Sequence, residues 1–193
     1  MGQGVSEVLP FAVGVAISPI PIIAVILMLL SNRAAVNGPA FLLGWVAGLS
    51  ILCLVVYVVA DAIGVTGDSS GADGVSWLDI ALGALLLAAA LRSWRKRPAA
   101  GAEPEMPAWL TDVATITPRK ALALGVGLSA ANPKNAVLTV GAAAGLAQVG
   151  VSAADVVVSV VVFVVIASSS VGGAVVYHVV GGDRAKKQLG ELR

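Results

Sequence analysis

The sequence predicts an all-α fold: a polytopic transmembrane helical bundle with five spans. Of its 193 residues, 58% are hydrophobic and only 12% are charged, and the mean hydropathy is +0.95. Soluble domains carry about 25% charged residues, so this composition is that of an integral membrane protein. The apolar residues also fall into long runs separated by polar or proline-rich segments, which divides the chain into spans and loops.

Charge and residue types exclude several functional classes. A net charge of +1, without a basic stretch interleaved with aromatics, gives no indication of nucleic-acid binding. Cys53 is the only cysteine, which excludes an intramolecular disulfide and a cysteine-rich metal site. The sequence contains no nucleophile–base set, metal-ligand cluster or phosphate-binding glycine loop, so we expect no enzyme, cofactor or metal site.

The first predicted span covers about residues 8–30 and is interrupted near its middle. It is long enough to cross the hydrocarbon core. Pro19 and Pro21 lie so close together that they must break or kink the helix. No basic segment precedes this run, and it is too long for a cleaved signal, so we interpret it as a retained helix.

The second predicted span covers about residues 38–60, and the third, shorter span covers about residues 77–91. Gly44 and Gly48 are four residues apart in the second span, which would let another helix approach closely. A loop rich in glycine, serine and aspartate joins the two spans, and tryptophans flank the third span as interfacial anchors do.

The fourth predicted span begins at Pro118 and ends near Ala147, and the fifth covers about residues 153–180. Ser168 to Ser170, followed by two glycines, predict a pliable point in the fifth span. The chain thus divides into a first set of three spans, a basic and proline-rich linker, and a second set of two spans with a polar tail: residues 1–92, 93–118 and 119–193.

Lysines and arginines in the loops predict the orientation. They occur at Arg33, in the linker and in the tail, but are absent from the loop at 61–79 and the turn at 148–152. Basic loops face the cytoplasm. We therefore expect a multi-pass cell (inner) membrane protein with its N-terminus outside and its central linker and C-terminal tail in the cytoplasm.

A polar, helix-breaking cluster lies in the middle of the fourth span. Pro133 removes a backbone hydrogen bond, Lys134 carries a charge, and Asn132 and Asn135 bring groups that need partners. Lys134 is 14 residues past the lysine that opens the span, about 21 Å of helix, which is too deep to snorkel to the inner surface. It therefore either binds an anionic head group or responds to protonation, or it is a structural lysine bonded to broken-helix carbonyls or neighbouring asparagines.

The first and fourth spans contain similar stretches. Residues 14–18 resemble residues 125–129, and residues 21–26 resemble 133–138, with a single-residue insertion between them. Three spans separate the copies, so their directions are opposite, as in transporters whose broken helices place a substrate site near the midplane. A chance match of common residues is the alternative. The predicted translocation site takes its residues from both breaks: Ser18, Pro19, Pro21, Ser129, Asn132, Pro133, Lys134 and Asn135.

Two inverted three-helix halves would require a sixth span after Arg193, which the sequence does not contain. The chain is then either a fragment of a longer protein or a five-helix variant whose missing helix is replaced by a partner.

The Ser-Pro-Ile-Pro motif at 18–21, the Asn-Pro-Lys-Asn motif at 132–135 and the basic, proline-containing linker resemble those of the GAP family. These are the (peptido)glycolipid- and sulfolipid-addressing membrane proteins of mycobacteria and related actinobacteria, within the lysine exporter superfamily. The resemblance covers nearly the whole chain. The superfamily implies six helices in two inverted halves and export from the cytoplasm, and the GAP branch implies the movement of cell-envelope glycolipids. The absent sixth span departs from this pattern.

The leading prediction is an inner-membrane transporter, or transport component, that exports a cell-envelope glycolipid or another anionic amphipathic solute through a midplane site. Export of a small cation or amino acid is the alternative within transport. A non-transporting scaffold of a lipid-export complex, held together through small-residue helix faces, is the alternative from another class. Expected partners are membrane lipids, the exported solute, and either further copies of this chain or lipid-export machinery.

Overall fold

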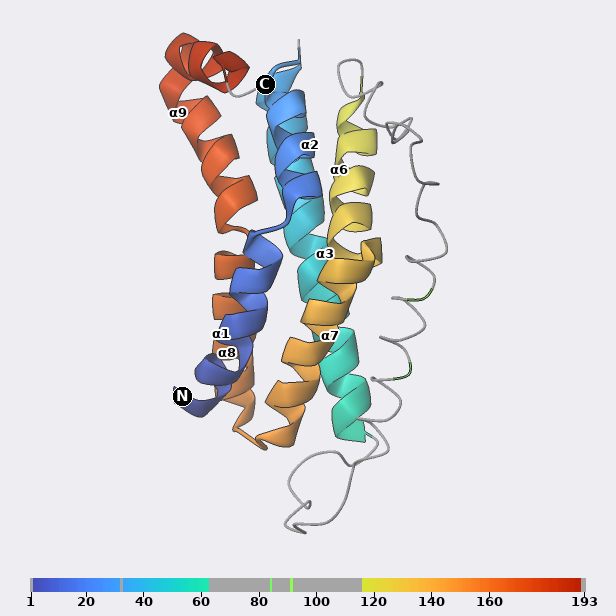
Figure 1. The fold of residues 1–193 in the computed structure, drawn as a ribbon. Helices are drawn as coiled ribbons and strands as arrows, with labels where there is room; N and C mark the ends of the chain where they lie inside the picture. The colour runs from blue at the N-terminus through green and yellow to red at the C-terminus, as the bar shows by residue number, and fades with distance from the viewer. Residues whose placement is uncertain (1, 32, 63–83, 85–90, 92–115, 192–193) are drawn as a thin grey trace.

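The structure, a computed structural model, describes residues 2–31, 33–62, 84, 91 and 116–191, with side chains as far as residue 181. All regular structure in these residues is helical (Figure 1). In chain order the elements are α1 Gly2–Ala16, α2 Pro19–Leu29, α3 Ala34–Ala62, α6 Pro118–Val126, the π-helix η2 Gly127–Ala131, α7 Pro133–Gln148, α8 Ala153–Ala167 and α9 Ser169–Glu191. The predicted third span and most of the predicted linker lie outside the described residues.

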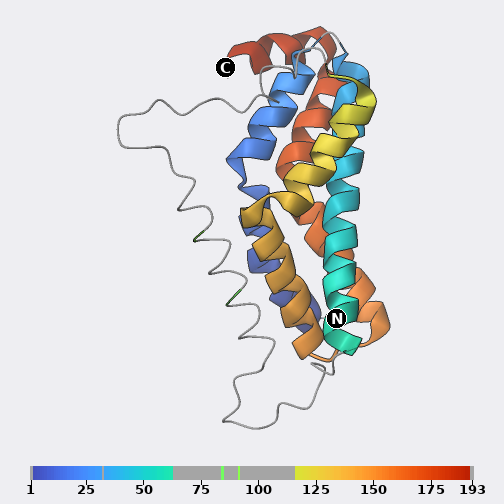
Figure 2. The same cartoon turned by 90° about the vertical axis from the view of Figure 1, so that its right-hand side faces the viewer.

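The helices form an elongated bundle in which several spans are built from two segments. α1 and α2 run from one end of the bundle to the other, α3 returns, α6, η2 and α7 run in the direction of α3, and α8 and α9 run in the direction of α1 (Figures 1 and 2). The turn between α7 and α8 uses Gly150 with φ at 62°, a conformation that favours glycine.

Membrane-spanning character is clear for part of the bundle. Among the described helices, α3 is long and apolar enough to cross a bilayer by itself, and α1 with α2 and α8 with α9 reach that length as bent pairs. Val157, Val161 and Val165 form one exposed stripe along α8, each more than half exposed. A continuous apolar stripe of this kind on the outer surface suits contact with lipid.

The predicted break in the first span is confirmed. α1 and α2 are bent by 55°, and Ser18 between them is extended, with φ −102° and ψ 109°. Asn132, which precedes α7, is extended in the same way, with φ −70° and ψ 119°. Each precedes a proline, whose ring disfavours helical geometry in the residue before it. The fourth predicted span is therefore divided into α6, η2 and α7.

The predicted pliable point in the fifth span is a true bend. α8 and α9 meet at 61°, with Ser168 between them. No proline is present there, so this bend has a different origin from the breaks at Ser18 and Asn132.

Small residues bring α3 into backbone contact with the fourth span. A side chain at Gly44 would collide with the carbonyl oxygen of Leu122, and one at Gly125 with that of Phe41. Gly48 packs against the hydroxyl of Ser129. The predicted role of the Gly44–Gly48 pair in close packing is confirmed, and it is an intramolecular role.

The interface between α1 and α7 uses another pair of glycines four residues apart, both in α7. Gly141 receives the ring of Phe11, and Gly145 lies under the side chain of Glu7. The large side chains Phe41, Trp45 and Phe163 are fully buried in the core. The two broken spans thus contact each other mainly through α1 and α7, and α3 packs along α6, η2 and α7 of the fourth span.

We predict that Gly44→Ala destabilises the protein by about 1–3 kcal/mol, because the added methyl group would meet backbone that cannot move aside easily. The matched control is Gly173→Ala in α9, where nothing lies within 4 Å of the added atom. That change should be neutral or stabilise by up to about 1 kcal/mol. Thermal unfolding of the detergent-solubilised full chain measures both, and equal stability of the two variants would contradict the packing described.

Candidate functional site

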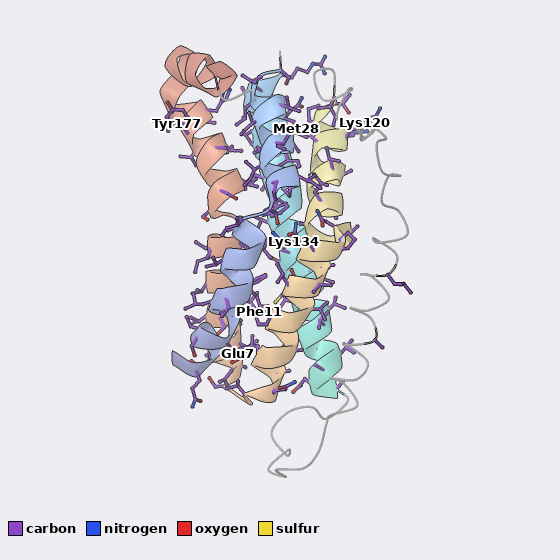
Figure 3. All side chains as sticks on the ribbon, in the orientation of Figure 1. Glu7, Phe11, Met28, Lys120, Lys134 and Tyr177 are labelled. Atoms are coloured by element: carbon purple, nitrogen blue, oxygen red, sulfur yellow. The ribbon has the colours of Figure 1, made fainter. Side chains whose placement is uncertain are left out.

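The candidate site lies at mid-height in the bundle, where the breaks in the first and fourth spans meet. Figure 3 shows Lys134 between the end of the bundle that carries Lys120 and the end that carries Glu7. Three helices begin or end here: α1 ends at Ala16, α2 begins at Pro19 and α7 begins at Pro133.

The break in the first span leaves a backbone carbonyl without its normal donor. In a continuous helix the N–H of residue 21 would bond to the carbonyl of Ile17. Residue 21 is a proline, which has no N–H. A carbonyl left unpaired at this depth costs several kcal/mol, so another donor is required.

Lys134 supplies that donor. Its Nζ donates to the carbonyl oxygen of Ile17 at 2.8 Å and to Oγ of Ser18 at 3.2 Å. Its backbone N–H donates to Oδ1 of Asn132 at 3.1 Å, which caps the N-terminus of α7. The interpretation of Lys134 as a lysine bonded to a broken-helix carbonyl therefore matches the observed contacts, and the side chain is also exposed at the surface of the chain.

Asn135 joins the two breaks from the buried side. Its Oδ1 accepts from Oγ of Ser18 at 2.6 Å, and its Nδ2 donates to the carbonyl of Leu128 at 3.0 Å. In the π-helical register of η2, the carbonyl of Leu128 would bond to residue 133, which is again a proline. Asn135 is fully buried, so it replaces this missing donor without contact with lipid.

The remaining predicted residues have different positions. Ser129 is fully buried, donates to the carbonyl of Val126 at 3.0 Å and packs on α3, so its hydroxyl serves the contact between the fourth span and α3. Pro19 and Pro133 are exposed and act through the backbone, as the first residues of α2 and α7. The structure thus brings together Ser18, Lys134 and Asn135, with Asn132 as the cap that fixes α7.

A third bent span also contributes to the site, through Ser170 of α9, a contact that the sequence did not predict. Its Oγ donates to the carbonyl of Ala16 at 2.7 Å, so α9 also holds the C-terminal end of α1. The signal was the serine triplet at 168–170, which lies in mid-span as the other two breaks do. From the sequence, this triplet predicts a pliable point and no contact with α1.

The electrostatics of the site favour a negative charge. Among the described residues no carboxylate forms an ion pair with Lys134, and no group of histidine, cysteine, aspartate and glutamate side chains could hold a metal ion. Helices α2 and α7 both begin at the site, and the N-terminus of each carries a partial positive charge.

The helices are apolar, and the breaks of the first and fourth spans meet at mid-height. These features define a helical membrane protein with a polar centre. The chain belongs to the SfLAP family, described as Sap, sulfolipid-1-addressing protein, whose family model matches residues 8–193. This confirms the sulfolipid-addressing family predicted from the two proline motifs. No curated protein and no solved structure matches the chain.

We predict that Lys134 is energetically coupled to Pro19 and Pro21. Lys134→Met should destabilise the protein by about 1–3 kcal/mol, because the carbonyl of Ile17 loses its donor. In a Pro19→Ala/Pro21→Ala background, where residue 18 is free to become helical and residue 21 has regained an N–H, the same change should cost about 1 kcal/mol less. A double-mutant cycle of unfolding free energies measures the coupling.

Lys120→Met is the control for the cycle, because this lysine is exposed at the start of α6. It should change stability by less than about 0.5 kcal/mol in either background. Strict additivity of Lys134→Met and the paired proline changes would show that Lys134 does not substitute for the missing N–H.

Proposed function

We propose that this protein is an inner-membrane transporter, or a transport component, that exports a cell-envelope sulfolipid or another anionic amphipathic solute. The observation that carries the proposal is the ammonium group of Lys134, held at the meeting point of two broken helices without a carboxylate partner in the part of the chain that the structure describes. An unpaired cation in mid-span is costly and marks a functional site in membrane proteins. The family description, which names a sulfolipid, agrees with an anionic amphiphile.

The charge of the site favours this substrate class over a small cation. Lys134 is positive, and α2 and α7 present their N-termini to the same region. Lys134 and these two N-termini would repel an entering cation, and the partial negative charge at the end of α1 is already bonded to Lys134, whereas a sulfate, phosphate or carboxylate would be attracted. The alternative of a small-cation exporter is therefore less well supported than that of an anion exporter.

The small-residue helix faces that a scaffold would use to bind a partner are not free in this protein. The glycine pairs that would have offered flat helix faces to a partner are occupied within the chain, by α6 and η2 on α3 and by α1 on α7. A scaffold would need other surfaces.

We infer an architecture of five spans with inverted halves. The first and fourth spans run in opposite directions (Figure 1), and each contains an extended residue followed by a proline at its break. The junction between α2 and α3, where Arg33 falls in the sequence, lies at the same end of the bundle as Lys120, and we assign this end to the cytoplasm (Figures 1 and 3).

The proposed mechanism exchanges one partner of Lys134 for another. In the structure the ammonium group bonds to the carbonyl of Ile17. A charged oxygen of the head group is a stronger acceptor than a neutral carbonyl. Binding would release the end of α1 from α7 and allow the halves to move about the break, as broken-helix transporters do.

We predict that deleting the encoding gene changes the envelope lipid composition, and that a Lys134→Met or Asn132→Ala copy fails to restore it. The abundance of each variant in the membrane is measured as well, because Lys134→Met should also lower stability and Asn132 caps α7, and export is compared at equal abundance. Lipid profiles of the wild type, the deletion strain and the complemented strains measure the effect.

The control for complementation is Lys120→Met, which removes a lysine from the same span but at the end of the bundle. It should restore export. An unaltered lipid profile in the deletion strain would refute lipid export, and full complementation by Lys134→Met would refute the central site.

We also predict the orientation of the bundle. In intact cells an impermeant thiol reagent should label Val149→Cys, in the turn between α7 and α8, and should label Lys120→Cys only after the membrane is opened. Both positions are exposed, while the native Cys53 is buried and gives a low background. The reverse labelling pattern would overturn the assignment of the basic end to the cytoplasm.

A further inference from the structure

Ser168, between α8 and α9, carries a polar group that the described contacts do not use. Its side chain is only 8% exposed, and its Oγ is a buried atom without a hydrogen-bond partner among the described residues. Ser18, Ser129, Ser159 and Ser170 all find an acceptor. A serine in a helix can usually donate to a carbonyl of the preceding turn, so the unused donor at Ser168 requires an explanation.

The position of Ser168 connects it to the central site. It directly precedes α9, a helix of 23 residues whose first backbone N–H groups lack helical acceptors. Ser170, two residues later, bonds to the carbonyl of Ala16, and Lys134 bonds to that of the next residue, Ile17. These acceptors are consecutive carbonyls at the end of α1, so the N-terminus of α9 and Lys134 are both bonded to the same point of the chain.

We propose that Ser168 is a further substrate-binding residue, and that its hydroxyl and the N-terminus of α9 bind the same anionic head group as Lys134, at the end of α1. The inference rests on the proposed function and extends it from two broken helices to three. Helix N-termini with an adjacent hydroxyl bind oxyanions through several donors at once.

The arrangement favours one class of head group. A sulfate or phosphate monoester carries three terminal oxygens in a tetrahedral arrangement, so separate oxygens can accept from Lys134 and from Ser168. A carboxylate has only two oxygens and offers fewer acceptors to the same set of donors. When the head group displaces the carbonyl of Ile17 from Lys134, the end of α1 loses one of its two side-chain contacts, which opens access to Ser168.

The test uses the full chain in lipid nanodiscs, with decyl sulfate as the probe and decyl maltoside as the uncharged comparison, titrated by calorimetry. Ser168→Ala should weaken decyl sulfate binding about tenfold, the loss expected for one hydrogen bond to a charged group. Ser168→Cys keeps nearly the same size but donates weakly, so it should show a similar loss. Neither change should lower the unfolding temperature without the probe, because the hydroxyl has no partner to lose.

Ser169→Ala is the matched control, because this neighbouring serine is exposed, and it should bind decyl sulfate as the wild type does. If Lys134→Met abolishes binding while both Ser168 variants bind normally, the inference about Ser168 is wrong and the proposed function stands. If decyl sulfate binds equally to all variants, or no better than decyl maltoside, the central site and the inference both fail.

Discussion

Backbone carbonyls released by proline inside a bilayer must find another donor, because no bulk water is available to them. Pro21 and Pro133 each create such a carbonyl, at Ile17 and at Leu128. Each is satisfied by a side chain of α7, Lys134 in one case and Asn135 in the other. The carbonyl of Ile17 in the first span therefore depends on the fourth span for its donor. The rest of the bundle keeps the two spans in contact.

Close packing maintains that contact. The glycines of α3 let it touch the backbone of α6 and the hydroxyl of Ser129 in η2, and those of α7 accept side chains of α1. These interfaces contain few atoms that could adjust, so the breaks are held at a fixed depth while their polar groups remain exchangeable. Lys134 differs from Asn135 in this respect, since Asn135 is fully buried while Lys134 is exposed. A structural bond and a binding role are compatible for Lys134, because a charged ligand can replace the carbonyl of Ile17.

The sequence predicted features that follow from local chemistry. Pro19, Pro21 and Pro133 fix where helices break whatever surrounds them, and the depth of Lys134 in an apolar run required a partner. It did not predict which carbonyl Lys134 would bond to, or that Asn135 would face Ser18, because these depend on how two spans separated by more than a hundred residues are packed. The role of Ser170 was missed for the same reason. Serine hydroxyls usually bond within their own helix, so a bond from α9 to α1 has no local signal.

The central claim is that Lys134 exchanges the carbonyl of Ile17 for an anionic head group. The most direct test is solid-state NMR of the full chain in bilayers, with ¹⁵N in the lysine side chains and ¹³C in the carbonyl of isoleucine. The dipolar coupling between Nζ of Lys134 and the carbonyl of Ile17, atoms joined by a hydrogen bond of 2.8 Å, should be strong without added ligand. It should be lost on adding decyl sulfate and unchanged by decyl maltoside. A coupling that persists at saturating decyl sulfate would show that Lys134 is a fixed structural donor, and the account of exchange would be wrong.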